Sequence, residues 1–314
     1  MSFDADIGTA PSSWLVPFPR PRFFVGRKAQ VEQINAHVSA DGGQRLAIYG
    51  LGGCGKTALA LESVYHARRL HPRHAIFWVS AVSRDSFEEG YQQIASLLGI
   101  VSVADGNGGD KKMDVKQQVK ERLNDESFGP WLLIVDNADD ADVLLGPSEK
   151  RSGTVQLIDY LPVSSKGSIL FTTRTRATAI KLAESNVIAL SQLDKAEAEE
   201  VLDMRLLNQK QPHEQETVAE FLEMLSYLAL AIVQAVAYIN TNDITLAEYI
   251  RRYRSSEKDA IELLSEDFED HGRYRSMENS IATTWFMSFE EIQKHNPAAV
   301  DCLSFMACVA HNGT

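Results

Sequence analysis

The residues whose types and spacing suggest chemistry lie between Gly50 and Thr57, where the chain reads Gly-Leu-Gly-Gly-Cys-Gly-Lys-Thr. This octet matches the phosphate-binding pattern G-x-x-x-x-G-K-[ST] at every fixed position. Glycines permit positive φ and close backbone approach, so successive N–H groups converge on a phosphate at a helix N-terminus. The lysine supplies a counter-charge, and the threonine hydroxyl suits Mg²⁺, which also uses water and phosphate oxygens. The octet therefore predicts a nucleotide site.

The flanking sequence supplies the strand and the helix that such a loop needs. Residues 45–49 are typical of a short buried strand, and residues 58–64 are typical of a helix. We expect Lys56 to neutralise β- and γ-phosphate oxygens and Thr57 to contact Mg²⁺. The nucleotide-binding residues predicted in this segment are Gly50, Gly52, Gly53, Cys54, Gly55, Lys56, Thr57 and Ala58. The other interpretation is a glycine-rich turn with a chance Lys-Thr, and the flanking elements argue against it.

A second group of polar residues follows the apolar run Trp-Leu-Leu-Ile-Val. Asp136 closes this run, where P-loop NTPases place the acid that holds Mg²⁺. We therefore predict Thr57 and Asp136 as the metal ligands, although alone Asp136 would be read as a surface aspartate that ends a strand. Asn137 cannot take a proton from an attacking water, so a general base would be Asp139, Asp140 or a residue elsewhere. We expect any hydrolysis to be slow.

Arg174 ends another apolar run, residues 167–173. The carboxyl ends of parallel strands face the crevice where such sheets bind ligands, so Arg174 would reach a γ-phosphate there. A solvated arginine in a basic stretch with Arg176 explains the residue equally well, and spacing alone leaves both interpretations open. The predicted catalytic residues are Asp136, Arg174, Asp139 and Asp140.

Strand-like apolar runs alternate with helical patterns as far as Leu193, and only helical patterns follow. The strands are expected at 45–49, 75–80, 131–136, 167–174 and 186–190, and the later helices at 197–207, 217–240, 246–264, 277–292 and 298–309. The alternation predicts a doubly wound α/β domain with a parallel sheet at residues 23–193 and an all-α part from residue 194. Residues 1–22 are rich in proline and serine and predict an extended leader without a core, so the fold should begin at Phe23.

The composition is that of a globular protein, with 44% hydrophobic residues in a chain of 314. A net charge of −12 argues against nucleic acid or an anionic membrane as the main partner, because phosphates reward clustered Lys and Arg. The longest apolar segment, 227–239, is shorter than the ~20 residues that a membrane span needs. Cys54, Cys302 and Cys308 fit neither a disulfide framework nor a zinc site, and no export signal is visible. We expect a cytoplasmic protein.

Four segments, taken in order, resemble the NB-ARC family, the nucleotide-switch module of the STAND class of P-loop NTPases in plant immune receptors, apoptosis adaptors and many fungal proteins. They are Phe24–Arg27, Gly50–Thr57, Leu132–Asp136 and Gly167–Arg174. The resemblance covers roughly residues 23–310 and implies an adenine nucleotide, ATP or ADP, and Mg²⁺ as cofactors. It also implies that Val25 and Arg27 lie against the adenine and ribose, and that Arg174 lies near the terminal phosphate.

The resemblance divides the second half into a helical domain at 194–270 and the start of a truncated winged-helix domain at 271–314. The family's Gly-Leu-Pro-Leu motif corresponds to Tyr-Leu-Ala-Leu here, which implies a base contact by Leu228. Ala229 replaces the proline, so we expect a kink and an adenine contact to be lost. Asn137 stands where the family often has an acid, and the sequence implies a fragment without effector or repeat domains.

These features favour an ADP/ATP-binding switch whose nucleotide state controls domain packing and self-association, or binding to a partner protein, in signalling. Two other classes of function stay open. One is an active ATPase that couples turnover to another task. The other is a scaffold or decoy that binds no nucleotide, which the substitutions at Asn137 and Ala229 would favour.

Overall fold

The computed structural model describes residues 13–39, 44–100, 114–146, 156–207 and 214–255, together with Ala298. The chain divides into two compact units. The first holds the chain up to Arg22 with 27–50 and 56–190, and the second holds 23–26, 51–55 and the chain from Ser191 onward.

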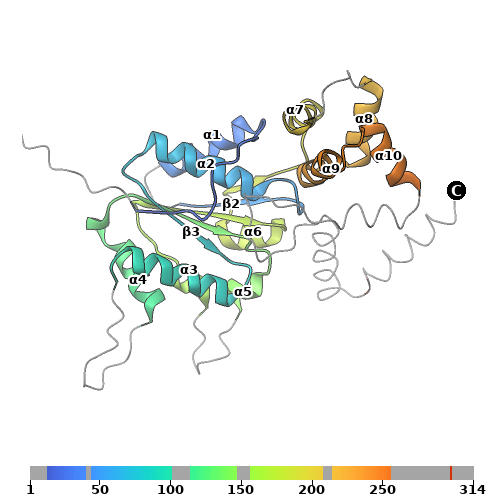
Figure 1. Ribbon diagram of the computed structural model, residues 1–314. Helices are drawn as coiled ribbons and strands as arrows, with labels where there is room; N and C mark the ends of the chain where they lie inside the picture. The colour runs from blue at the N-terminus through green and yellow to red at the C-terminus, as the bar shows by residue number, and fades with distance from the viewer. Residues whose placement is uncertain are drawn as a thin grey trace, which may run out of the picture. The chain divides into compact units, whose positions relative to one another are not determined.

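The first unit is built on a six-stranded sheet in which every strand pair is parallel (Figure 1). Its strands, in the order in which they pair, are β1 (Trp14–Leu15), β3 (Ala75–Ser80), β4 (Trp131–Asp136), β5 (Gly167–Thr173), β2 (Arg45–Tyr49) and β6 (Val187–Ala189). Every residue of β4 and β5 is buried, as expected for parallel strands that helices cover on both faces. The predicted α/β class is confirmed.

Helices cover both faces of this sheet (Figure 1). One face carries α1 (Lys28–Ser39) and α2 (Lys56–Leu70), and the other carries α3 (Arg84–Leu97), α4 (Val115–Asn124), α5 (Ala141–Leu145) and α6 (Arg176–Ala183). Helix α3 shows why the sequence folds this way. A capping box between Ser83 and Ser86 starts it, and Phe87, Tyr91 and Ile94 at helical spacing are fully buried against the sheet.

The segment expected to be a leader without a core belongs to the first unit. Trp14 of the edge strand β1 pairs with Ile76 of β3, and the Ile76 N–H donates to the Ser13 carbonyl at 2.8 Å. Phe18 is buried, and Arg68 lies over the Trp14 ring at 4.2 Å. The fold therefore begins before Phe23. The expectation failed because the open N–H and C=O groups of β3 offered a partner that proline and serine content does not reveal.

The second unit is helical in the residues that the structure describes. It contains α7 (Lys195–Arg205), α8 (Gln215–Met224), α9 (Ala229–Asn242) and α10 (Leu246–Ser255). The expected single helix at 217–240 is wrong, because the chain turns at Ser226 and Tyr227, where φ is 51° and 53°. The Tyr227 N–H donates to the Leu222 carbonyl at 3.0 Å and closes α8. The spacing of apolar residues does not indicate a turn of this kind when no glycine marks it.

Several expectations fall outside the described residues. They are the helices expected at 277–292 and 298–309, apart from Ala298, and the winged-helix start expected at 271–314. The part of the expected helix 246–264 that follows residue 255 also lies outside. No helix within the described ranges is long and apolar enough to cross a membrane.

Gly167 offers a test of how tightly the strands pack. A Cβ added at this residue would overlap the indole ring of Trp131, which is fully buried and donates its Nε1 proton to the Leu123 carbonyl at 2.8 Å. Gly167→Ala should therefore lower the free energy of unfolding by about 1–3 kcal/mol or more, measured by chemical denaturation. The same change in a Trp131→Leu background should cost clearly less. Equal costs in the two backgrounds would contradict the overlap.

Candidate nucleotide site

The phosphate-binding loop leaves β2 at the carboxyl edge of the sheet, the edge where the parallel strands end. Gly53 and Gly55 adopt φ of 80° and 100°, which side chains other than glycine rarely tolerate. The Gly50 N–H donates to the Thr173 carbonyl at 3.3 Å, which ties the start of the loop to the end of β5. Cys54 is buried within the loop. The backbone therefore has the glycine-dependent turn that the sequence predicted.

Lys56 and Thr57 open helix α2, and Ala58 follows in its first turn. The Lys56 side chain is buried, and its ammonium donates to the Gly50 carbonyl at 2.8 Å, which keeps the charge inside the loop. Because the first N–H groups of a helix have no intrahelical partner, this end of α2 also favours an anion. The lysine charge and the helix N-terminus together suit a phosphate group.

Asp136 lies fully buried at the end of β4, beside the start of α2. The Thr57 hydroxyl donates to Asp136 Oδ1 at 3.1 Å, and the Thr172 hydroxyl donates to the same oxygen at 2.5 Å. Burial raises the pKa of Asp136 to about 6, against the lowering by these two hydrogen bonds and by the charge of Lys56. The structure thus brings the two predicted metal ligands, Thr57 and Asp136, together.

Thr172 also belongs to this site, although the sequence pattern alone does not indicate it. It is fully buried in β5, beside β4, and its hydroxyl accepts from the Asn137 N–H at 2.9 Å while it donates to Asp136. The signal was present in the sequence as a hydroxyl residue inside an apolar strand. Only the β4–β5 register identifies the carboxylate that it faces.

Asn137 occupies a left-handed backbone position, with φ of 59°. Asparagine tolerates this conformation better than most residues, and its side-chain amide donates to Asp136 Oδ2 at 3.3 Å. In this position the residue turns the chain and supports the buried carboxylate, where an acid would add a second charge.

Arg174 and Asp139 form an ion pair at the carboxyl edge, with Arg174 Nε 2.8 Å from Asp139 Oδ2. Asp140 is the N-cap of α5, where its carboxylate accepts from the Asp142 N–H at 2.8 Å. The two predicted candidate bases therefore make other contacts in this structure. Asp139 pairs with Arg174, the arginine predicted near the γ-phosphate, and Asp140 caps α5.

Val25 and Arg27 flank a glycine in the short segment before α1. Val25 is buried, and Gly26 and Arg27 both adopt positive φ, of 65° and 54°. A Cβ at Gly26 would overlap the side chain of Glu197, whose carboxylate closes the capping box of α7. Residues 23–26 group with the second unit, and Arg27 groups with the first.

The loop tip, residues 51–55, groups with the second unit. There the Leu230 N–H, in the first turn of α9, donates to the Gly53 carbonyl at 3.0 Å, and Leu228 is buried before the helix. Ala229 is the first residue of α9. The expected loss of a kink is therefore wrong, because proline at the first position of a helix starts it without a bend.

The donor set fits the group that the sequence predicted. A hydroxyl and a carboxylate are oxygen ligands of the kind that Mg²⁺ uses when phosphates complete its shell. A cation would also offset the cost of the buried Asp136 charge, which is visible in the raised pKa. Lys56, Thr57 and Asp136 are the residues that would hold Mg²⁺ and the phosphates.

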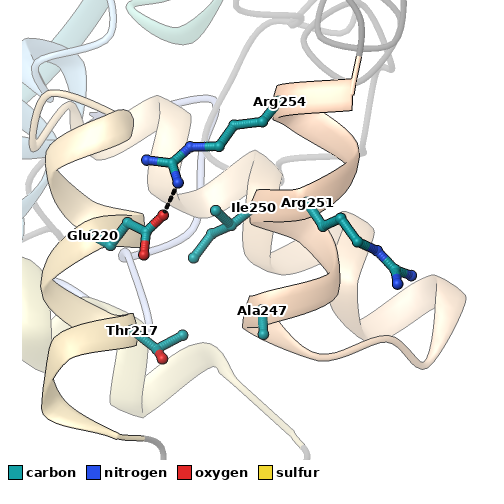
Figure 2. A pocket seen from close by; sticks show the side chains of 6 residues that line it. All are labelled: Thr217, Glu220, Ala247, Ile250, Arg251 and Arg254. Carbon is teal, nitrogen blue, oxygen red and sulfur yellow. Dashed lines mark ion pairs between the residues drawn. The ribbon is translucent and has the colours of Figure 1, made fainter.

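The second unit also has a pocket of about 460 Å³ between α8 and α10 (Figure 2). An ion pair between Glu220 and Arg254, at 2.5 Å, lies beside it. The remaining lining residues are Thr217, Ala247, Ile250 and Arg251. None of the predicted site residues lines this pocket.

Comparison with known proteins decides the family. The NB-ARC domain family matches residues 27–211, which is more than half of the chain. The chain belongs to the NB-ARC family. A nucleotide-binding leucine-rich repeat (NLR)-like protein of Hyaloscypha variabilis is 40% identical over 308 residues, which is 95% of this NB-ARC chain. The match spans only 31% of that relative's length.

Solved structures share the fold at low sequence identity. A Walker-type ATPase of Pyrococcus abyssi superposes with a TM-score of 0.60 at 13% identity, over 96% of this chain and 87% of its own. Drosophila ORC bound to DNA superposes with a TM-score of 0.53 at 13% identity, over 80% of this chain and 66% of its own. At these identities the likeness shows a P-loop NTPase fold and nothing about ligands or partners.

Thr172→Val should lower the free energy of unfolding by about 1–3 kcal/mol, because it leaves the Asn137 N–H and the Asp136 carboxylate short of a partner at nearly constant side-chain volume. Thr172→Ser, which keeps the hydroxyl, is the matched control. Chemical denaturation of the three proteins measures the difference. Similar losses for valine and serine would mean that the methyl group, and not the hydroxyl, matters.

Ala229→Pro should be tolerated and raise stability by about 0.4–1 kcal/mol, because it restricts the unfolded chain at a position that suits proline. Leu228 before it has φ −80° and ψ 118°, which proline allows in its preceding residue. Leu230→Pro is the contrast, because it removes the N–H that donates to Gly53. Leu230→Ala controls for the lost side chain. Thermal melts that rank Ala229→Pro below wild type would contradict the assignment of the helix start.

Proposed function

We propose that this NB-ARC chain is an ADP/ATP-binding switch, in which the bound nucleotide biases the packing of the parts of the protein and its self-association or binding to a partner protein. The observation that carries the proposal is the cluster at the start of α2. Lys56 is held inside the loop, and Thr57 donates to the fully buried Asp136. A structural role alone gives no reason to bury a carboxylate beside a helix N-terminus that suits phosphate and Mg²⁺.

Slow turnover is part of the proposal. Asn137 in its left-handed position supports Asp136 and has no group that takes a proton from water. Asp139 is paired with Arg174, and Asp140 caps α5. Both candidate bases, Asp139 and Asp140, therefore have a structural partner, which favours retention of nucleotide over rapid hydrolysis.

Coupling between nucleotide and the helical part is supported by the loop tip. Its Gly53 carbonyl accepts from the first turn of α9, so a change in the loop would act on this hydrogen bond. The NLR-like relative is consistent with a signalling role, and the cytoplasmic setting expected from the sequence remains a prediction. DNA in the ORC structure belongs to that protein and adds no nucleic acid to this proposal.

The direct test is mass spectrometry of any nucleotide that the purified protein retains, followed by calorimetric titration of the stripped protein with ADP and ATP in Mg²⁺. We expect retained ADP and binding of both nucleotides. Absence of binding would reject the switch and favour a scaffold or decoy. Steady phosphate release at the ~1 s⁻¹ or faster that is ordinary for enzymes would favour an active ATPase.

Lys56→Ala should weaken binding of both nucleotides by tenfold or more, about 1.4 kcal/mol, because the charge inside the loop is lost. Lys181→Ala removes the same charge from the exposed side of α6 and serves as the matched control. Calorimetry on both variants distinguishes the loss of a charge at the nucleotide site from the loss of a charge on the surface. Thermal melts confirm that both variants fold. Equal affinities in the two variants would reject the role of Lys56.

A further inference from the structure

The ion pair between Arg174 and Asp139 joins two residues that follow neighbouring strands. Arg174 comes directly after β5, and Asp139 lies in the turn after β4. The two side chains are only 19% and 26% exposed, and Nε and Oδ2 lie 2.8 Å apart. Partial burial and a short charged hydrogen bond make this contact stronger than an ordinary surface pair.

The backbone fixes the position of Asp139 on both sides. The N–H groups of Asn137 and Ala138 donate to the hydroxyl and the carbonyl of Thr172, at 2.9 and 2.8 Å. After Asp139, Asp140 is held as the N-cap of α5. The carboxylate is therefore presented to Arg174 by an anchored turn and not by a mobile loop.

Asp139 also affects the protonation of the neighbouring Asp136. Its negative charge adds to burial in raising the pKa of Asp136. Its second oxygen, Oδ1, is buried and has no hydrogen-bond partner among the described residues, so Arg174 supplies the main compensation for this carboxylate. A further negative group brought to this edge would be repelled by Asp139 and attracted by the same arginine.

We propose that Asp139 is the counter-ion that competes with a terminal γ-phosphate for Arg174, and that it thereby sets a preference for nucleoside diphosphate over triphosphate. The inference rests on the proposed function and deepens it. A diphosphate leaves the Arg174–Asp139 pair intact. A triphosphate must draw the arginine away or accept the repulsion of the carboxylate, and either cost lowers its affinity. Asp139 is then a specificity-determining residue and not the general base.

The experiment compares the affinities of ADP and a non-hydrolysable ATP analogue, both with Mg²⁺, by calorimetry. Asp139→Asn should move the affinity ratio toward the triphosphate by about fivefold or more, within the usual range of such couplings. Asp142→Asn is the matched control, because it removes the same charge from an exposed position of α5 nearby. It should leave the ratio within about twofold of wild type. Thermal melts verify that both variants fold.

Arg174→Gln tests whether the effect passes through the arginine. In that background Asp139→Asn should shift the ratio clearly less than in wild type, because the competition for Arg174 is gone and only the repulsion between Asp139 and the phosphate remains. A shift as large as that in the wild-type background would overturn the inference. A fall in triphosphate affinity in Asp139→Asn would also overturn it, since the carboxylate would then orient Arg174 for phosphate. An unchanged ratio with both nucleotides bound would overturn this inference alone. Wild-type protein that binds neither nucleotide would overturn the proposed function as well.

Discussion

The parallel register of β2, β4 and β5 is the constraint on which the site depends. Tyr49 lies opposite Thr173, and Val135 lies opposite Phe171, so these three strands end at the same level. The residue that follows each strand, or closes it, then stands at one edge of the sheet. Residues far apart in the chain meet there because buried strands leave no freedom of register: a slip by one residue would turn every side chain to the other face.

The buried charge of Asp136 explains much of the local architecture. A carboxylate away from water is costly unless donors surround it, and hydroxyls of Thr57 and Thr172 with the amide of Asn137 supply them. The Thr172 hydroxyl also accepts from the Asn137 N–H in the turn after β4. One hydrogen-bond network therefore stabilises the Asp136 charge and fixes the path of this turn. This turn in turn carries Asp139 to Arg174. Thr172 thus connects the buried Asp136 carboxylate to the turn that positions Asp139.

The loop shows how one short segment serves two compact units. Lys56 and Thr57 belong to the sheet and its helix, whereas the loop tip belongs with the helical unit through the bond between Gly53 and Leu230. The covalent chain joins the two without a linker. The proposed switch relies on this continuity of the backbone, because a phosphate held by Lys56 would bind a chain segment that also carries the hydrogen bond between Gly53 and Leu230.

Local residue types and periodicity are enough to predict the phosphate loop, the apolar strands that precede each functional residue, and hence the α/β class. Which of these residues contact one another depends on how the strands and turns are placed in three dimensions. The register of β4 and β5 places Thr172 beside Asp136. The anchored turn after β4 places Asp139 beside Arg174. Positive φ at Ser226 and Tyr227 divides the segment that was expected to be one helix. Trp14 likewise joined the sheet edge through hydrogen bonds to a strand far along the chain. Such contacts join residues distant in sequence, so no local pattern encodes them.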